Sequence, residues 1–75
     1  MEQTTFLENF KNILDDTDVS LITIETNFRE LTEWSSLTAL SLIAMVDEAY
    51  SVKLSGDDIK VSKTLNDIFN IIKSK

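Results

Sequence analysis

The sequence contains neither cysteine nor histidine, and these two absences exclude much of enzyme chemistry. Without cysteine there is no disulfide, no thiolate metal site and no thiol nucleophile. Without histidine the chain lacks the usual general base near neutral pH, the commonest zinc ligand and any serine–histidine catalytic pair. At 75 residues a single core barely outweighs chain entropy, which leaves little room for a deep pocket. We therefore expect no deep enzyme pocket and no metal site.

Proline is also absent and glycine occurs once, a composition that favours helices over tight hairpins. With 43% hydrophobic and 27% charged residues, the composition is that of a globular domain. No apolar stretch approaches the ~20 residues that span a bilayer. Glu2 and Glu8 occupy positions where a signal peptide carries basic residues. We expect one domain over residues 1–75, soluble, cytoplasmic and monomeric, with no membrane partner.

Basic residues are scarce, numbering 7 against 13 acids, so the formal net charge is −6. The imbalance is strongest in residues 1–35, which hold eight acids and two bases. Nucleic acids are bound through lysine and arginine, and their phosphates repel an acidic domain. We therefore expect no nucleic-acid partner and predict protein partners with basic surfaces.

The first segment is apolar along one helical face. Its apolar positions repeat at i, i+4, i+7 and i+8: Phe6, Phe10, Ile13 and Leu14. This spacing predicts a helix over about residues 2–15, capped by Thr4 or Thr5, whose apolar face packs against the second and last helices. The acidic cluster Asp15, Asp16 and Asp18 then ends the helix, because carboxylates at a helix C-terminus oppose its dipole. That cluster lacks the glycine and distal glutamate of an EF-hand, so we expect solvated acids rather than a calcium site.

Residues 19–32 lack a clean helical period. We expect an irregular crossing segment whose apolar side chains enter the core: Val19, Leu21, Ile22, Ile24, Phe28 and Leu31. The alternation in "VSLITIE" is typical of a strand, but no second strand is available to pair with it.

Two further helices and a short helical turn complete the expected fold. The segment from Ser36 to Tyr50 has the strongest helical signal and a wide apolar band, with Ser35 as its N-cap. "SGDDIKVS" predicts one short helical turn. Ser62 or Lys63 precedes a last helix over about residues 64–73, whose apolar positions are Leu65, Ile68, Phe69 and Ile72. The predicted fold class is all-α, a small four-helix bundle with three main helices and one short helix.

The two hydroxyls before the central helix allow two interpretations. In the first, Ser35 is a cap worth about 1 kcal/mol and Ser36 is an ordinary first helical residue. In the second, Ser36 is modified, because the positive end of a helix dipole accepts a phosphate and no other residue offers chemistry. Residue types alone leave this choice open.

The residues around this serine resemble an acyl carrier protein. Phe28 lies eight residues before Ser36, Leu37 follows it, and the acidic pair Asp47-Glu48 precedes Tyr50, which lies fourteen residues after Ser36. The tail is similar to the same family at Val52, Leu54, Asp57-Asp58 and Thr64-Leu65. With the first helix included, the resemblance spans nearly the whole chain.

This resemblance implies a non-catalytic carrier of biosynthetic intermediates rather than an enzyme. In the family, a serine hydroxyl is joined through a phosphodiester to 4′-phosphopantetheine, whose thiol holds an acyl or aminoacyl group as a thioester. Ser36 is the matching position. The implied partners are a phosphopantetheinyl transferase, acyl- or aminoacyl-loading ligases, and synthase or transferase enzymes with basic docking surfaces.

Some residues depart from the family pattern. Ser35 stands where the residue before the serine is commonly Asp, and Thr38, Ser41 and Met45 stand where the second helix of fatty-acid carriers is typically acidic. These departures favour a specialised carrier serving secondary-metabolite, polysaccharide or amino-acid-loading enzymes over the main fatty-acid carrier. Two alternatives stay open: a peptidyl-type carrier loaded with an amino acid, and an unmodified acidic helical interaction module.

The resemblance also implies a docking surface for partner enzymes. We expect its charges at Glu30, Glu33, Asp47 and Glu48, and its apolar contacts at Leu37, Met45 and Trp34. For two of these residues a structural role is an equal or commoner alternative: Trp34 as a half-buried lid over the core, and Met45 as helix packing.

Overall fold

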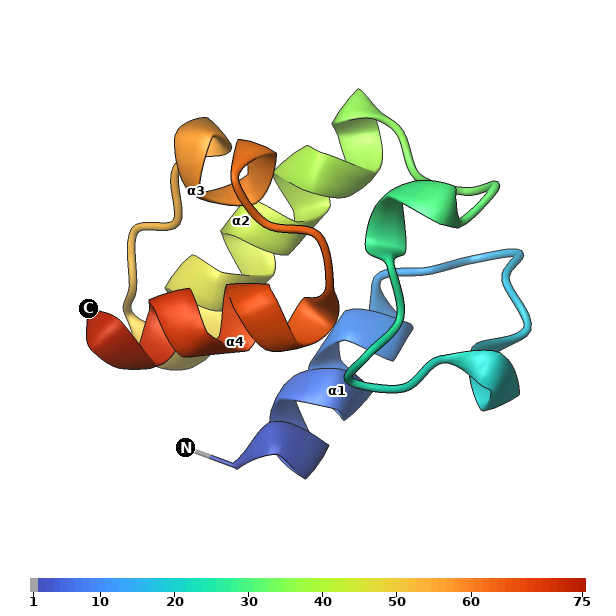
Figure 1. Cartoon of the computed structure of the whole chain (residues 1–75), viewed down its shortest axis with the longest axis horizontal. Coiled ribbons are helices and arrows are strands. Elements are labelled where there is room, and N and C mark those ends of the chain that lie inside the picture. The colour runs from blue at the N-terminus through green and yellow to red at the C-terminus, as the bar shows by residue number, and fades with distance from the viewer. Residues whose placement is uncertain (1) are drawn as a thin grey trace.

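The computed structural model describes residues 2–75 and contains four α-helices and two short 3₁₀ helices (Figure 1). The elements are α1 (Gln3–Asn12), η1 (Val19–Leu21), η2 (Phe28–Glu30), α2 (Ser36–Tyr50), α3 (Gly56–Lys60) and α4 (Leu65–Ser74). No strand forms in residues 2–75, where Asn27 and Thr64 make an isolated bridge. The predicted small all-α bundle is confirmed. In the same residues no helix has the length and apolar character needed to cross a membrane.

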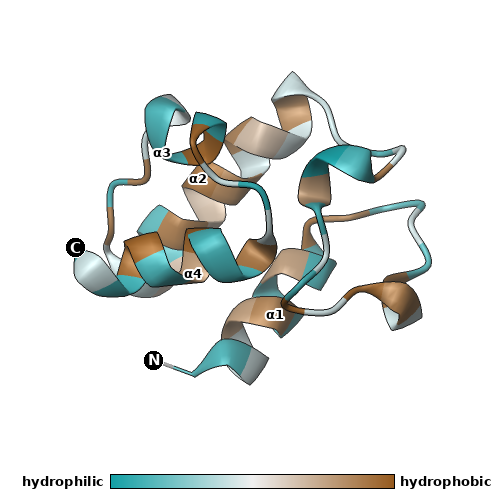
Figure 2. Ribbon diagram, in the orientation of Figure 1, coloured by the Kyte–Doolittle hydropathy of each residue, from teal (hydrophilic) through white to brown (hydrophobic). Residues whose placement is uncertain are grey.

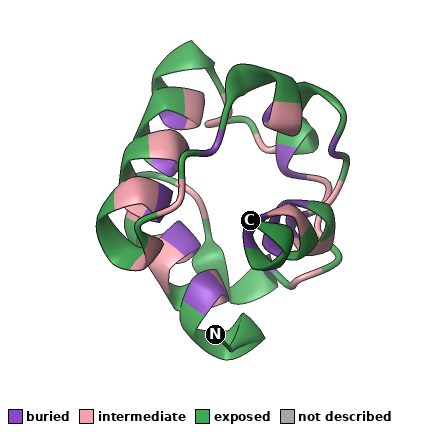
Figure 3. Ribbon diagram, turned by 90° about the vertical axis from the view of Figure 1, so that its left-hand side faces the viewer, coloured by how far each residue is buried: buried purple, intermediate pink, exposed green. Residues whose placement is uncertain are grey.

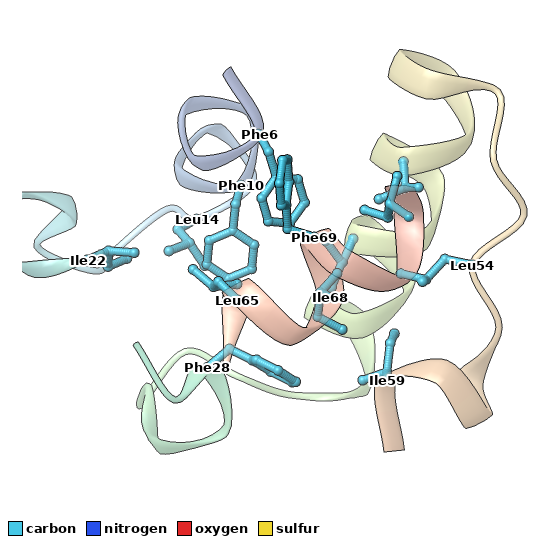
Figure 4. Packing of buried hydrophobic residues seen from close by; sticks show 13 residues of the cluster. Phe6, Phe10, Leu14, Ile22, Phe28, Leu54, Ile59, Leu65, Ile68 and Phe69 are labelled. Carbon is cyan, nitrogen blue, oxygen red and sulfur yellow. The ribbon is translucent and has the colours of Figure 1, made fainter. Parts of the chain in front are cut away.

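The core lies between the helices and receives side chains from every α-helix. Its largest fully buried side chains are Phe6, Phe10, Phe28, Leu42, Leu65, Ile68 and Val46. Phe6 and Phe10 point from α1 toward Phe69 and Leu65 of α4 (Figure 4), and the Phe6 and Phe69 ring centroids are 5.7 Å apart. α1 contacts both α2 and α4. The predicted packing of the first helix is therefore confirmed.

The hydropathy pattern explains why these segments form helices. Apolar positions recur along the ribbons of α1 and α4, with hydrophilic positions between them (Figure 2). Figure 3 shows that the buried positions face the interior of the molecule and the exposed positions face outward. In α4 all four predicted apolar positions are buried: Leu65, Ile68, Phe69 and Ile72. Each helix therefore turns one apolar stripe toward the core.

The ends of α1 differ from the prediction. Glu2 is the N-cap and makes no side-chain cap bond, whereas Thr4 and Thr5 lie inside the helix and are exposed. The helix ends at Asn12 rather than at residue 15, with Ile13 as its C-cap. The early end lets the chain turn so that Leu14 enters the core.

Two of the apolar residues predicted to enter the core from the crossing segment do not. Val19 is 36% exposed and Leu21 is 76% exposed, whereas Ile22 and Phe28 are buried. The segment starts with η1, which is capped by the Asp18 carboxylate. In so tight a turn neighbouring side chains point in different directions, so the chain that buries Ile22 turns Leu21 outward.

α4 begins one residue later than the predicted residue 64. Thr64 is its N-cap and forms a capping box with Asp67, in which each side chain bonds to the backbone of the other residue. Ser62 is buried, and its hydroxyl donates to the Asp58 carbonyl at 2.8 Å. Ser62 thus closes the end of α3 rather than starting α4.

Candidate functional site

The two adjacent serines at the start of α2 have different roles. Ser35 is the N-cap: its Oγ accepts from the Thr38 backbone N–H at 3.4 Å and lies 3.3 Å from the Thr38 hydroxyl. Ser36 is the first helical residue and is exposed, and its hydroxyl makes no hydrogen bond within residues 2–75. The predicted Ser35 cap is confirmed. Of the two serines, only Ser36 has a hydroxyl without a hydrogen-bond partner among residues 2–75.

Buried side chains hold the segment that leads into α2. The Thr38 hydroxyl donates to the Glu33 carbonyl at 2.7 Å, which explains why a threonine is 8% exposed inside the bundle. The Trp34 ring packs edge-on against the fully buried Phe28 ring, with centroids 4.7 Å apart. Trp34 is half-buried, as the lid interpretation expects. The backbone carrying Ser36 is thus anchored to the core on both sides.

The Glu33 carboxylate binds the loop that follows α1. It accepts from the Thr17 hydroxyl at 2.7 Å and from the backbone N–H groups of Asp15, Asp16 and Thr17 at 2.5, 3.0 and 3.0 Å. The Thr17 hydroxyl bond, followed by the Asp15 backbone bond, lowers the pKa of Glu33. Because these donors favour the ionised carboxylate, Glu33 ties the loop to the segment preceding Ser36 most strongly while it is charged.

The hydrogen bonds from residues 15–17 to the Glu33 carboxylate, called the Glu33 clamp below, predict a specific pH dependence of stability for the Glu33→Gln variant. The pKa of Glu33 is lowered on folding, so its charge stabilises the folded state above the ordinary value of 4.5, and that stabilisation is lost as the pH falls through the folded-state pKa. Urea unfolding should show the wild type more stable than Glu33→Gln at pH 6, with the difference shrinking below about pH 4. A difference that stays constant from pH 6 to pH 3 would contradict the Glu33 clamp.

The outer face of α2 carries two exposed leucines. Leu37 is 76% exposed and Leu40 is 61% exposed, so they form an apolar patch one helical turn wide beside Ser36. Leu37 is a predicted contact residue of the docking surface, but Leu40 is not. Leu40 was missed because it is one of many apolar residues in this helix. Its spacing of three from Leu37 was the available signal.

The other residues predicted to contact partner enzymes lie along α2, on η2 or in the segment before α2. Asp47 pairs with Lys53 at 2.8 Å, and Glu48 is exposed. Met45 is half-buried and lines a surface groove of about 580 Å³ between α1 and α2. Glu33 and Trp34 are engaged within the chain, as described above, and Glu30 is exposed on η2. Leu37 is therefore exposed on the outer face of α2, while Met45 and Glu48 both border the groove toward α1.

The residues that replace acids on α2 occupy three different environments. Thr38 is buried, Met45 is half-buried and Ser41 is exposed. Of these three residues, only Ser41 therefore leaves a fully exposed position uncharged where fatty-acid carriers are typically acidic. Within residues 2–75 no three acidic side chains come together as a metal site, and the Asp18 carboxylate instead accepts from Ser20.

The family described as "Phosphopantetheine attachment site" matches residues 5–72. The chain belongs to this family. A search among curated proteins finds no significant match. Carrier domains of this family bear covalent 4′-phosphopantetheine, are generally non-catalytic, and work with a phosphopantetheinyl transferase and biosynthetic enzymes.

The site of this phosphopantetheine carrier fits the group that its family bears. Ser36 offers an exposed hydroxyl at the first position of α2. The backbone N–H groups of Ser36 and Leu37 have no backbone partner within residues 2–75, so the helix end can stabilise the negative charge of a phosphodiester. Arg29 and Lys60 share a surface cavity with Ser36 and add positive charge. A hydroxyl, two free N–H groups and two cations suit a phosphate ester.

Proposed function

We propose that Ser36 is the residue to which 4′-phosphopantetheine is attached, and that the chain carries acyl or aminoacyl groups on that arm as thioesters. One observation favours Ser36 over Ser35. The Ser35 oxygen is occupied as the cap of α2, whereas the Ser36 oxygen is exposed and free of hydrogen bonds within the described residues. The family match to residues 5–72 supports the carrier role.

The chain's own part in the modification is to present the hydroxyl. With no histidine or cysteine, it has no side chain that would deprotonate Ser36 near neutral pH, so the transferase supplies the base that takes the proton. The Ser36 oxygen then forms a new bond to the phosphorus of a pyrophosphate-linked phosphopantetheine donor, and the P–O bond to the donor's other phosphate breaks so that this phosphate departs with the bonding electrons. The first-turn N–H groups lie beside the charged product, where the helix dipole stabilises it.

We further propose a specialised carrier that serves secondary-metabolite, polysaccharide or amino-acid-loading enzymes. Two features of α2 support this. Its outer face near Ser36 is apolar at Leu37 and Leu40, and its acids, Asp47 and Glu48, lie in the last turns of the helix. Partners therefore need an apolar contact at the first turn of α2 and basic residues farther along.

A loading experiment tests the carrier function and separates acyl from aminoacyl cargo. The chain, modified by a phosphopantetheinyl transferase, is incubated with ATP and adenylating ligases supplied with fatty acids or with amino acids. Intact mass should rise only for the modified chain, and hydroxylamine should remove the gain because it cleaves thioesters. A chain that gains no mass from an active transferase would instead be the unmodified interaction module.

The proposed docking surface predicts that apolar truncation and charge reversal act differently. Leu37→Ala should slow phosphopantetheine transfer at least fivefold, because a central apolar contact often contributes more than about 1 kcal/mol of binding. Leu21→Ala is the matched control, since Leu21 is equally exposed at 76% but lies on η1. Both variants should unfold at wild-type temperatures. Equal transfer rates for Leu37→Ala and Leu21→Ala would contradict docking at Leu37.

The acids of α2 should control the rate of association. Asp47→Lys with Glu48→Lys should lower the association rate with a basic partner, and added salt should shrink that defect as the Debye length falls below about 8–10 Å. Glu2→Lys with Glu8→Lys, at the N-cap of α1 and inside it, changes the net charge equally and should have the smaller effect on the association rate. Equal slowing by both pairs would mean that net charge alone steers association.

A further inference from the structure

A surface cavity of about 350 Å³ lies directly beside Ser36. It is formed by the first turns of α2, by η2 and by α3, and the lining residues used below are Arg29, Trp34, Ser36, Ala39, Ile59 and Lys60. Cavities that hold small ligands measure about 300–1,000 Å³, so this one has room for part of a small molecule.

The charge of this cavity is opposite to that of the chain. The net charge is −6, and residues 1–35 hold only two bases, yet one of those bases, Arg29, lines this cavity together with Lys60. No Asp or Glu from residues 2–75 lines it. Two cations without a carboxylate to neutralise them make the cavity suited to an anion.

Arg29 is fixed in position by the chain itself. Its Nη2 donates to the backbone carbonyls of Ile59 and Lys60, at 2.6 Å in both bonds. Its Nη1 and Nε make no hydrogen bond within residues 2–75, so the rest of the planar guanidinium keeps its donors free. A guanidinium held on one side and free on the other is preorganised to bind a phosphate oxygen.

Taking Ser36 as the attachment residue, which is the proposed function above, we propose that this cavity holds the near end of the phosphopantetheine arm. Arg29 and Lys60 bind the phosphodiester. The apolar walls at Trp34, Ala39 and Ile59 contact the geminal dimethyl group that follows it. The arm therefore rests against the η2 and α3 side of the carrier between encounters with enzymes, rather than moving freely from the start of α2.

Nuclear magnetic resonance of the chain before and after modification tests this placement. Intact mass first confirms that each sample is modified. Gly56 also lines the cavity. The resonances of the Gly56 and Lys60 amides and of the Arg29 Nε–H should then shift, although these residues are remote from Ser36 in sequence. Nuclear Overhauser contacts should join the geminal methyl groups to Ala39 and to the Trp34 ring.

Charge-removing variants supply the control. Lys60→Gln leaves the Arg29 bonds intact, because these go to backbone carbonyls, and should reduce the Gly56 shift at least twofold. Lys73→Gln removes an equal charge beside Tyr50, at the far end of α2, and should leave that shift unchanged. Arg29→Lys keeps the charge without the guanidinium and should weaken the methyl contacts.

Two outcomes separate the failure of this placement from the failure of the proposed function. A sample that gains the mass but shows shifts only at residues 35–38, with no methyl contacts, overturns the placement and leaves the carrier function intact. A Ser36 that gains no mass overturns the proposed function, and the placement falls with it. Equal Gly56 shifts in Lys60→Gln, Lys73→Gln and wild type also overturn the placement.

Discussion

Replacing Ser36 with alanine is expected to abolish phosphopantetheine transfer completely, while replacing Ser35 leaves the chain modified. The Ser36 oxygen has no hydrogen bond within the described residues, so its loss removes the acceptor for the phosphoryl group without disturbing the fold. Alanine also suits the first turn of a helix. Ser35→Ala instead removes the cap of α2 and should cost about 0.5–2 kcal/mol of stability.

Intact mass spectrometry and thermal unfolding measure the two effects on the same samples. Ser36→Ala should unfold at a temperature close to that of the wild type and gain no mass. Ser35→Ala should unfold at a lower temperature and still gain the phosphopantetheinyl mass. The reverse pattern of mass gain, with Ser35 required and Ser36 dispensable, would show that the fourteen-residue spacing to Tyr50 identifies the wrong serine.

Phe10→Ala is expected to leave the chain largely unfolded. Phe10 is fully buried and points toward α4, and truncating a buried phenylalanine costs about 3–5 kcal/mol. A single hydrophobic core in a domain of about this size rarely supplies more than about 3–5 kcal/mol of stability in total. The substitution therefore removes much or all of the free energy that keeps the chain folded.

Urea unfolding followed by circular dichroism checks this prediction. Thr5→Ala is the control, because Thr5 is an exposed residue of the same helix and should change the midpoint little. A cooperative transition for Phe10→Ala within experimental error of the wild type would show that α1 does not pack on α4 as described.

The helices with one apolar face were the most predictable part of the fold. Leu65, Ile68, Phe69 and Ile72 are spaced so that one face of α4 is apolar, and all four are buried. α2 is apolar on most of its surface, so its period does not say which leucines point inward. Leu42 joins the buried core cluster, whereas Leu40 stays exposed, a choice that depends on neighbours distant in sequence.

The hydrogen bonds around Ser36 could not be predicted from local patterns. The Glu33 carboxylate bonds to residues 15–17, and the Arg29 guanidinium bonds to carbonyls 30 and 31 residues away. Such contacts have no period and no short motif, because they depend on where the folded loops meet. The Ser35 cap was predictable, since a cap needs only its own helix.

The attachment of phosphopantetheine to Ser36 is tested most directly by locating the added mass within the wild-type chain. The chain is produced together with an active phosphopantetheinyl transferase, and the intact protein is fragmented along its backbone in the mass spectrometer. N-terminal fragments that end at Ser35 should be unmodified, and every fragment that includes Ser36 should carry the phosphopantetheinyl mass. Added mass on fragments that end at Ser35, or no added mass anywhere in the chain, would contradict the account.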